Sequence, residues 1–185
     1  MEVTPTALPE VLLIEPKLFG DERGFFFESW KQDRYLEHGL PAEFVQDNIS
    51  RSDKGTLRGL HFQEPNAQGK LVSVLQGQVF DVAVDVREGS PRFGKWIGVE
   101  LDGEKHHQLW IPPGFAHGFC VLSESADFFY KCTTLYSPET EQAIRYDDPT
   151  IGIDWPVETP ILSRKDEVAP VLAEAPVLPA YEHAE

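Results

Sequence analysis

The chain has 185 residues, of which 41% are hydrophobic and 25% are charged, a composition typical of a soluble globular protein. This length suits a single domain over residues 1–185 with a real core, and is too short for two ordinary domains. With 16 basic and 31 acidic residues the net charge is −15, so the protein has no overall positive field for nucleic acid or an anionic membrane. A phosphorylated ligand would need a local cluster of arginine and lysine.

The two cysteines and the N-terminus bear on where the protein works. Cys120 and Cys132 lie in apolar runs and form no C-x-x-C motif, so we expect reduced, buried thiols and a reducing compartment. The N-terminus has no basic region followed by an apolar one, and the apolar run 11–14 is far too short to span a bilayer. We therefore expect a cytoplasmic protein.

In chain order, the sequence predicts a strand over 11–15, a loop over 18–24 and a second strand over 25–30. A short helix is expected over 33–38, because Gly39 follows it as a C-terminal glycine. Asp102-Gly103 lies between two predicted strands and is a dipeptide typical of β-hairpins. The remaining strands are predicted over 44–50, 56–63, 70–76, 78–87, 94–101, 107–111, 117–122, 126–134 and 142–146.

These elements define the expected fold class. About ten short strands separated by turn signals, with few short helices, indicate an all-β protein, an antiparallel β-sandwich or jelly roll. Within 78–87, apolar residues alternate with a period of two, which is typical of a sheet with one apolar face. Residues 169–185 are rich in Ala, Pro and Glu, so we expect an extended or loosely ordered C-terminal tail.

The predicted strand 57–63, with sequence LRGLHFQ, carries the first candidate functional residue, His61. Alternation along a strand puts His61 and Gly59 on one face and Arg58 on the other. The glycine leaves space for a ligand beside the histidine. A lone histidine is more often a half-buried core residue. A second stretch, 111–119, changes that balance because it places His117 after a Pro-Gly turn.

These two stretches resemble the cupin family of jelly rolls, whose second motif is matched by Pro112-x-Gly114-x-x-His117. The first cupin motif usually carries His-x-His, but Gln63 stands where its second histidine would be. A first-row metal needs three or four N, O or S ligands, and only His61 and His117 are at hand. We therefore expect no metal and a histidine that is free to act as a base near pH 7.

Three further residues are candidates for the same site. Taken singly, Lys70 is usually a solvated charge, Tyr130 a core tyrosine and Asp166 a helix cap or turn residue. His106 and His107 lie beside the predicted hairpin, and we expect them at the surface.

A longer series of motifs resembles the dTDP-4-dehydrorhamnose 3,5-epimerase family, which consists of metal-free cupins. The resemblance runs from about residue 14 to residue 170, and the order of the motifs makes it specific. They are Phe19-x-Asp21-x-Arg23-Gly24, FVQDN (44–48), LRGLH (57–61), Gly69-Lys70, VFDV (79–82), PGFAHGF (113–119), Tyr130-Lys131, Tyr136-Ser137-Pro138 and Ser163-x-Lys165-Asp166.

The resemblance implies an isomerase of L-rhamnose biosynthesis for cell-envelope polysaccharide, without a cofactor. It would invert carbons 3 and 5 of dTDP-4-dehydro-6-deoxy-D-glucose through an enolate to give dTDP-4-dehydro-L-rhamnose. His61 would be the base, supported by Asp166, while Lys70 would stabilise the enolate and Tyr130 would return the proton from the opposite face.

The resemblance also implies a binding site and a partner. Arg23 and Arg58 would hold the diphosphate, and Tyr136 would stack on the thymine. The family is a homodimer whose N-terminal strands are exchanged and contribute to the partner's site. The rest of the site would be lined by Phe19, Phe26, Glu28, Gln46, Asn48, His117, Glu141 and Lys165.

One residue departs from the pattern, and three other functions stay open. Leu135 stands where many members have an aromatic residue, which bears on packing beside the nucleotide and on base preference. A related epimerase acting on a single carbon, or on another 4-keto nucleotide sugar, would share His61, Lys70 and Tyr130. A metal cupin is disfavoured by Gln63. A non-catalytic jelly roll that binds sugar nucleotides would have no need for a base, its carboxylate partner and an acid.

Overall fold

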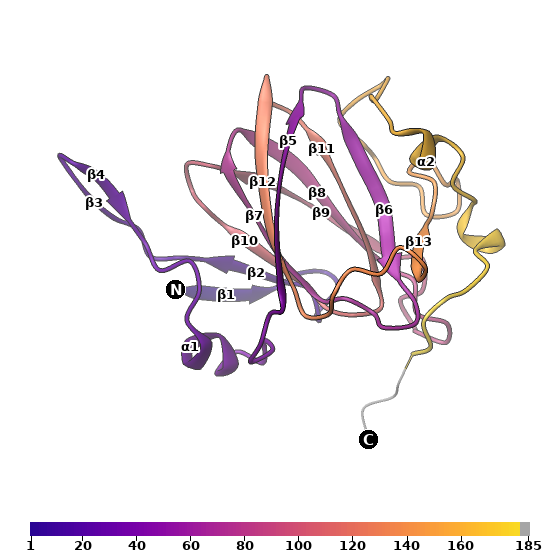
Figure 1. The fold of residues 1–185 in the computed structure, drawn as a ribbon, viewed down its shortest axis with the longest axis horizontal. Coiled ribbons are helices and arrows are strands. Elements are labelled where there is room, and N and C mark those ends of the chain that lie inside the picture. Colours follow the sequence, from indigo (N-terminus) through magenta and orange to yellow (C-terminus); the bar gives the residue numbers. More distant parts are fainter. Residues whose placement is uncertain (182–185) are drawn as a thin grey trace.

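The computed structural model describes residues 1–181, and two antiparallel sheets packed face to face form its body (Figure 1). The first sheet has the strand order β1 (Glu2–Pro5), β2 (Leu12–Glu15), β10 (Gln108–Ile111), β7 (Lys70–Gln76), β12 (Ser125–Cys132) and β5 (Gln46–Asp53). The second has the order β13 (Glu141–Ala143), β6 (Leu57–Gln63), β11 (Phe115–Val121), β8 (Gln78–Asp85) and β9 (Trp96–Asp102). The predicted all-β class is confirmed.

Few elements lie outside the two sheets. A hairpin of β3 (Phe19–Asp21) and β4 (Gly24–Phe26) projects from the body (Figure 1). The helices among residues 1–181 are short: α1 (Gln32–Leu36), α2 (Arg164–Glu167) and the 3₁₀ helix η1 (Leu172–Glu174). None of the helices in this part of the chain is long and apolar enough to cross a membrane.

Most predicted strands are confirmed to within a few residues, and the structure differs from the predictions at four places. The strand expected over 25–30 ends at Phe26, and β1 and β3 were not predicted. Asp102-Gly103 is a turn but not a hairpin turn, because β9 pairs with β8 in one sheet whereas β10 pairs with β7 and β2 in the other. A dipeptide can specify a turn, but the choice of pairing partner belongs to the packing of the sheets.

The apolar interior divides into two main regions. One cluster fills the space between the sheets and includes Val72, Leu109, Phe119 and Phe128. A second lies on the outer face of the second sheet, where Leu60 and Val82 pack against segments that follow β13. Both faces of this second sheet are therefore covered, which explains why β8 and β11 are buried along almost their whole length.

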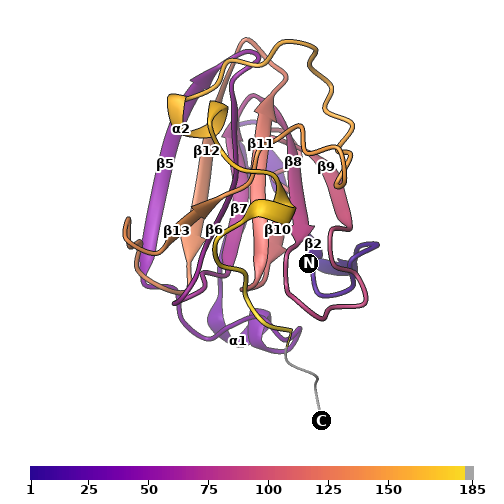
Figure 2. The ribbon, with the colours of Figure 1, turned by 90° about the vertical axis from the view of Figure 1, so that its right-hand side faces the viewer.

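The C-terminal segment provides part of that outer cover. Figure 2 shows it running across the second sheet, and Leu172 is buried in the outer cluster. The Glu88 amide donates to the Pro179 carbonyl at 2.8 Å, and the Tyr181 amide donates to the Glu88 carbonyl at 2.9 Å. Residues 169–181 are therefore docked rather than loosely ordered. The last residues of the expected tail, 182–185, lie outside the described part.

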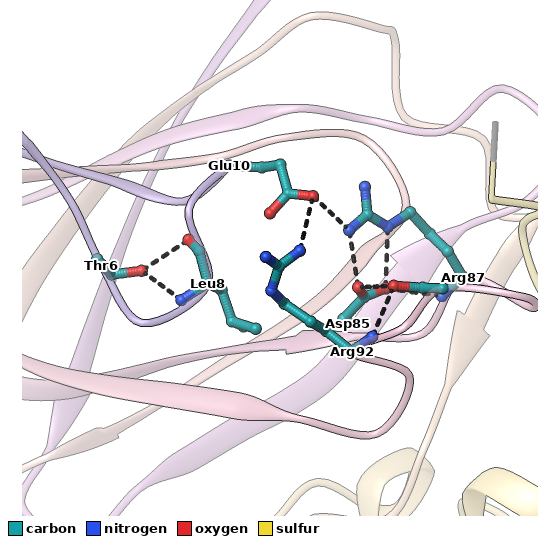
Figure 3. Close-up of polar contacts among 7 residues, drawn as sticks. Thr6, Leu8, Glu10, Asp85, Arg87 and Arg92 are labelled. Carbon is teal, nitrogen blue, oxygen red and sulfur yellow. Dashed lines mark hydrogen bonds and ion pairs between the residues drawn. The ribbon is translucent and has the colours of Figure 1, made fainter. Parts of the chain in front are cut away.

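Arg87, just beyond the end of β8, joins the β1–β2 connection to the second sheet (Figure 3). Its guanidinium donates to Asp85 at 2.7 and 2.9 Å and to Glu10, in the β1–β2 connection, at 3.1 Å. The same guanidinium lies over the rings of Phe115 and Tyr181. Because Asp85 is fully buried, these contacts fix where the N-terminal segment leaves the body.

Candidate active site

Polar residues from both sheets line two adjoining cavities of about 350 and 450 Å³. The cavities share His61, Lys70 and Tyr130 in their walls. β5, β7 and β12 of the first sheet form one side, and β6, β11 and β13 of the second form the other (Figure 1). Together they are large enough for a small-molecule ligand.

His61 on β6 forms a short contact with a buried carboxylate. Its Nε2 lies 2.6 Å from Asp166 Oδ1, and the other carboxylate oxygen, Oδ2, accepts a hydrogen bond of 2.8 Å from Ser163 Oγ. If Nε2 carries the proton, Nδ1 is left with the free lone pair that a base needs. The Ser163 hydroxyl also accepts from the Asp166 amide and so caps α2.

Asp166 reaches His61 because the chain before α2 is attached to the β5–β6 turn. The Ile161 amide donates to the Gly55 carbonyl at 2.8 Å, and the Leu57 amide donates to the Ile161 carbonyl at 3.0 Å. These bonds lay residues 161–163 beside the start of β6, one helical turn from the carboxylate. Ser163 belongs to one of the sequence motifs, but no role was predicted for it.

The surroundings set the protonation of this pair. Burial lowers the pKa of His61, and the hydrogen bond and charge of Asp166 only partly oppose it. Burial alone would raise the pKa of Asp166, but His61, Ser163 and Lys165 outweigh it and leave that pKa below its ordinary value. The arrangement therefore favours a neutral imidazole beside an ionised carboxylate, which is the state of a general base at rest.

Lys70 on β7 and Tyr130 on β12 approach from the opposite sheet. Burial lowers the pKa of the Lys70 ammonium, although Cys132, Glu141 and Asp81 oppose the shift. Burial also raises the pKa of the Tyr130 phenol, so it stays protonated and can donate a proton. Cys132, whose Sγ accepts a long hydrogen bond from Asn48, lines the cavity as well, although the sequence predicted it only as a buried thiol and not as a site residue.

Arg58 lies in the same cavity as His61, which corrects the prediction that they occupy opposite faces. His61 pairs with His117 and Arg58 pairs with Phe119, so β6 uses one residue more than β11 over this stretch. Such a bulge shifts the alternation of side chains by one position. The Arg58 Nε then donates to Ser52 Oγ at 3.0 Å across the sheets.

His117 is paired with a carboxylate that was not a candidate. Its Nε2 lies 2.9 Å from Asp81 Oδ2 on β8, and Asp81 is fully buried. Burial raises the pKa of Asp81, opposed by His117 and Lys70. The sequence held one signal for this residue, an acidic side chain in the middle of an apolar strand.

At the other end of the site, a chain of contacts connects the remaining predicted binding residues. Gln46 donates to Asn48 Oδ1 at 3.0 Å and accepts from the Tyr136 amide at 2.8 Å. The Tyr136 hydroxyl donates to Glu141 at 3.0 Å, and Lys165 Nζ donates to the other Glu141 oxygen at 2.7 Å.

Four predicted site residues line neither of these cavities. Phe19, Arg23 and Phe26 lie on the β3–β4 hairpin, where the Phe26 residue is 69% exposed and the Arg23 side chain 85% exposed. Glu28 follows the hairpin and pairs with Arg34 at 2.9 Å. The hairpin projects away from the cavities of its own chain (Figure 1).

His106 corrects another expectation, because it is only 6% exposed. Its ring packs against those of Phe25 and Phe27, with centroid distances of 4.6 and 4.7 Å. The apolar neighbours arrive from a distant part of the chain, so a surface position was the natural expectation from the sequence.

Among residues 1–181, no group of three or more His, Cys, Asp or Glu side chains is arranged to hold a metal ion. His61 and His117 are instead each paired with their own carboxylate. The donor set thus suits proton transfer better than metal coordination.

A family model described as dTDP-4-dehydrorhamnose 3,5-epimerase matches residues 5–174. A relative from Shigella flexneri with the same description is 59% identical over 168 residues, covering 90% of this chain and 93% of that protein. Another, from Neisseria gonorrhoeae, is 54% identical over 176 residues, covering 95% of this chain, and here the chain spans only 54% of the longer protein.

Among solved structures, an epimerase from Legionella pneumophila in complex with dTDP-4-keto-L-rhamnose is similar over 98% of this chain and 99% of its own. The sequences are 56% identical and the TM-score is 0.95.

Proposed function

We propose that this chain, which belongs to the dTDP-4-dehydrorhamnose 3,5-epimerase family, converts dTDP-4-dehydro-6-deoxy-D-glucose into dTDP-4-dehydro-L-rhamnose. The reaction proceeds through an enolate, with a base and an acid from opposite sheets. The observation that carries this mechanism is the shared cavity: His61 reaches it from the second sheet, and Tyr130 from the first. Inversion at a carbon needs proton removal on one face and proton delivery on the other, and two facing sheets supply both.

The first step is removal of a proton next to the carbonyl. Carbons 3 and 5 flank the keto carbon 4, so their hydrogens are acidified by it. His61 takes the proton through its free ring nitrogen and becomes imidazolium, and Asp166 at 2.6 Å stabilises that charge. The electron pair of the broken C–H bond moves into the enolate, whose oxygen is stabilised by the Lys70 ammonium.

The second step delivers a proton to the opposite face. Tyr130 gives its phenolic proton to the carbon and becomes phenolate, the enolate returns to the ketone, and the configuration is inverted. Solvent then restores the proton to Tyr130 and accepts the one held by His61, so protons balance over each inversion. The same cycle serves the second carbon after the sugar ring has moved in the site.

The substrate's nucleotide diphosphate would lie along the rest of the cavity. Arg58 suits the diphosphate because its planar fork matches phosphate oxygens and supplies local positive charge in a protein of net charge −15. Tyr136 would stack on the thymine, with Gln46, Asn48, Glu141 and Lys165 around it.

We propose further that the protein is a homodimer in which each hairpin completes the partner's site. Three of the predicted binding residues lie on a hairpin that projects away from its own cavities, with exposed phenylalanines. Strands β1 and β2 pair within their own sheet, so the β3–β4 hairpin is the segment available for exchange. Exposed apolar surface of this kind favours association.

We place this activity in the cytoplasm. The support is that both cysteines are free and buried, as is usual in a reducing compartment. Fractionation of cells that express the protein tests this, and recovery of the activity outside the cytoplasm would contradict it.

The decisive experiment is incubation with dTDP-4-dehydro-6-deoxy-D-glucose in heavy water. Deuterium at both carbons 3 and 5, with inverted product, supports the 3,5-epimerase. Deuterium at one carbon would instead indicate a single-carbon epimerase, and none at either carbon would indicate a binding protein.

A further inference from the structure

Gln63, the last residue of β6, is 3% exposed and uses its side-chain amide to bind backbone. Its Nε2 donates to the Asn66 carbonyl at 2.7 Å and to the Leu135 carbonyl at 3.2 Å, and its Oε1 accepts from the Ser137 amide at 2.9 Å. These bonds hold the residues immediately before and after Tyr136.

Further contacts join the same two loops. Gln68 Nε2 donates to the Thr134 carbonyl at 2.6 Å, and Thr134 Oγ1 donates to the Ala67 carbonyl at 3.2 Å. The Gly69 amide donates to Thr133 Oγ1 at 2.8 Å. The loop after β6 and the loop after β12 are therefore bound together along their length, with Gln63 as their buried centre.

Tyr136 stands at the end of this arrangement. It lines the smaller cavity and is half exposed, so apart from the hydrogen bond that its hydroxyl donates to Glu141, its side chain has little packing to fix its position. Its backbone is fixed by Gln63 on both sides and by Gln46 at its own amide. If the loop is already ordered in the ligand-free protein, binding does not have to supply the free energy that ordering it would cost, and the affinity is higher.

We propose that Gln63 is a positioning residue for nucleotide binding: it holds the 135–137 backbone so that Tyr136 is already in place to stack on the base of a pyrimidine nucleoside diphosphate. The proposal rests on the proposed function, in which Tyr136 receives the thymine. At the position where a metal cupin has a ligand, this chain thus has an amide that organises the substrate site.

The test is a double-mutant cycle on dTDP affinity, measured by calorimetry with parent, Gln63→Met, Tyr136→Ala and the double variant. Methionine keeps the length of glutamine but makes none of the three hydrogen bonds. We expect Gln63→Met to weaken dTDP binding about tenfold, the cost of ordering a loop side chain on binding. In the Tyr136→Ala background, the same change should alter affinity by less than about twofold.

Steady-state kinetics of Gln63→Met distinguish a positioning role from a general structural defect. Because Gln63→Met leaves His61, Lys70 and Tyr130 unchanged, kcat at saturating substrate should stay within about twofold of the parent while KM rises. A fall in kcat with unchanged KM would overturn the proposal. Equal weakening of dTDP binding in both backgrounds would also overturn it, because Gln63 would then act on the ligand directly and not through Tyr136.

A measurement on the parent protein covers the case in which Gln63→Met does not fold. Amide hydrogen exchange of ligand-free protein should show the Ser137 N–H protected, although it lies in a loop. Exchange at the rate of an unstructured loop would refute the proposal. If the parent does not bind dTDP, the proposed function fails. If the parent binds dTDP and Tyr136→Ala weakens that binding, but Gln63→Met does not, only the role of Gln63 is refuted.

Discussion

Two inactive variants of this protein should restore each other if the β3–β4 hairpin completes the partner's site. The pair is Arg23→Ala, which removes the exposed hairpin cation, and His61→Asn, which removes the base. Co-expression gives a mixture in which each subunit carries one defect. If a site combines His61 of one subunit with Arg23 of the other, a mixed dimer has one intact site and one site with both defects.

The expected magnitude follows from this geometry. Random pairing makes half of the dimers mixed, and half of their sites intact, so activity should return to about a quarter of the parent value. Mixed dimers isolated through two different affinity tags should reach about half. The assay is substrate conversion at a substrate concentration below KM, where the rate depends on kcat/KM and therefore falls when an arginine that binds the diphosphate is lost. Sedimentation verifies that the protein is a dimer.

A matched control uses two residues that line one cavity of a single chain. When His61→Asn is mixed with Tyr130→Phe, each site still lacks one of its two catalytic groups, the base or the acid. Activity should therefore stay at the level of the separate variants. If the Arg23→Ala and His61→Asn mixture shows no more activity than the mean of its two homodimers, the hairpin does not serve the partner's site.

The other predictions concern single residues of the cavity. Tyr130→Phe keeps the ring but loses the acid, so we expect continued exchange of substrate hydrogen for deuterium at one carbon or more with little inverted product; inversion of both carbons at the parental rate would show that the donor lies elsewhere. His61→Asn should lower turnover by at least about 10²-fold with little change in dTDP affinity, and near-parental deuterium exchange would remove His61 from the mechanism. Arg58→Lys keeps the charge but loses the planar fork and should weaken dTDP binding measured by calorimetry, as should Arg58→Ala, and parental affinity in both would exclude the diphosphate role. Because burial lowers the pKa of His61, the acid limb of the pH profile of kcat/KM should lie below about pH 6.5, the ordinary histidine value. Asp166→Asn removes a partner that raises this pKa, so the acid limb of the variant should move to lower pH while the plateau rate falls. An acid limb that moves to higher pH would contradict the pairing of His61 with Asp166.

Residue types and their local spacing were enough to predict most strands, the family and many residues of the candidate site. Period-two alternation and turn residues were sufficient for most strands, because each strand must present an apolar face to a neighbouring layer. The order of short motifs was sufficient for the family and for the residues around the cavity, including His61, Lys70, Tyr130 and Asp166. These are properties of side-chain type and spacing, which a sequence displays directly.

The tertiary structure decided what depends on distant segments meeting. An extra residue in β6 turned Arg58 toward the cavity of His61, because a bulge arises from pairing with β11 and not from the strand alone. Asp81 is the partner of His117 because β8 and β11 pair in one sheet. Ser163 is the partner of Asp166 because it caps α2. Gln63 gained its role only where two loops meet, and His106 was buried by aromatic rings from the base of the hairpin. Side-chain type and local periodicity can be read directly from the sequence. Hydrogen-bond partners, burial and the register between strands depend on tertiary packing, because they are properties of pairs of residues far apart in the chain.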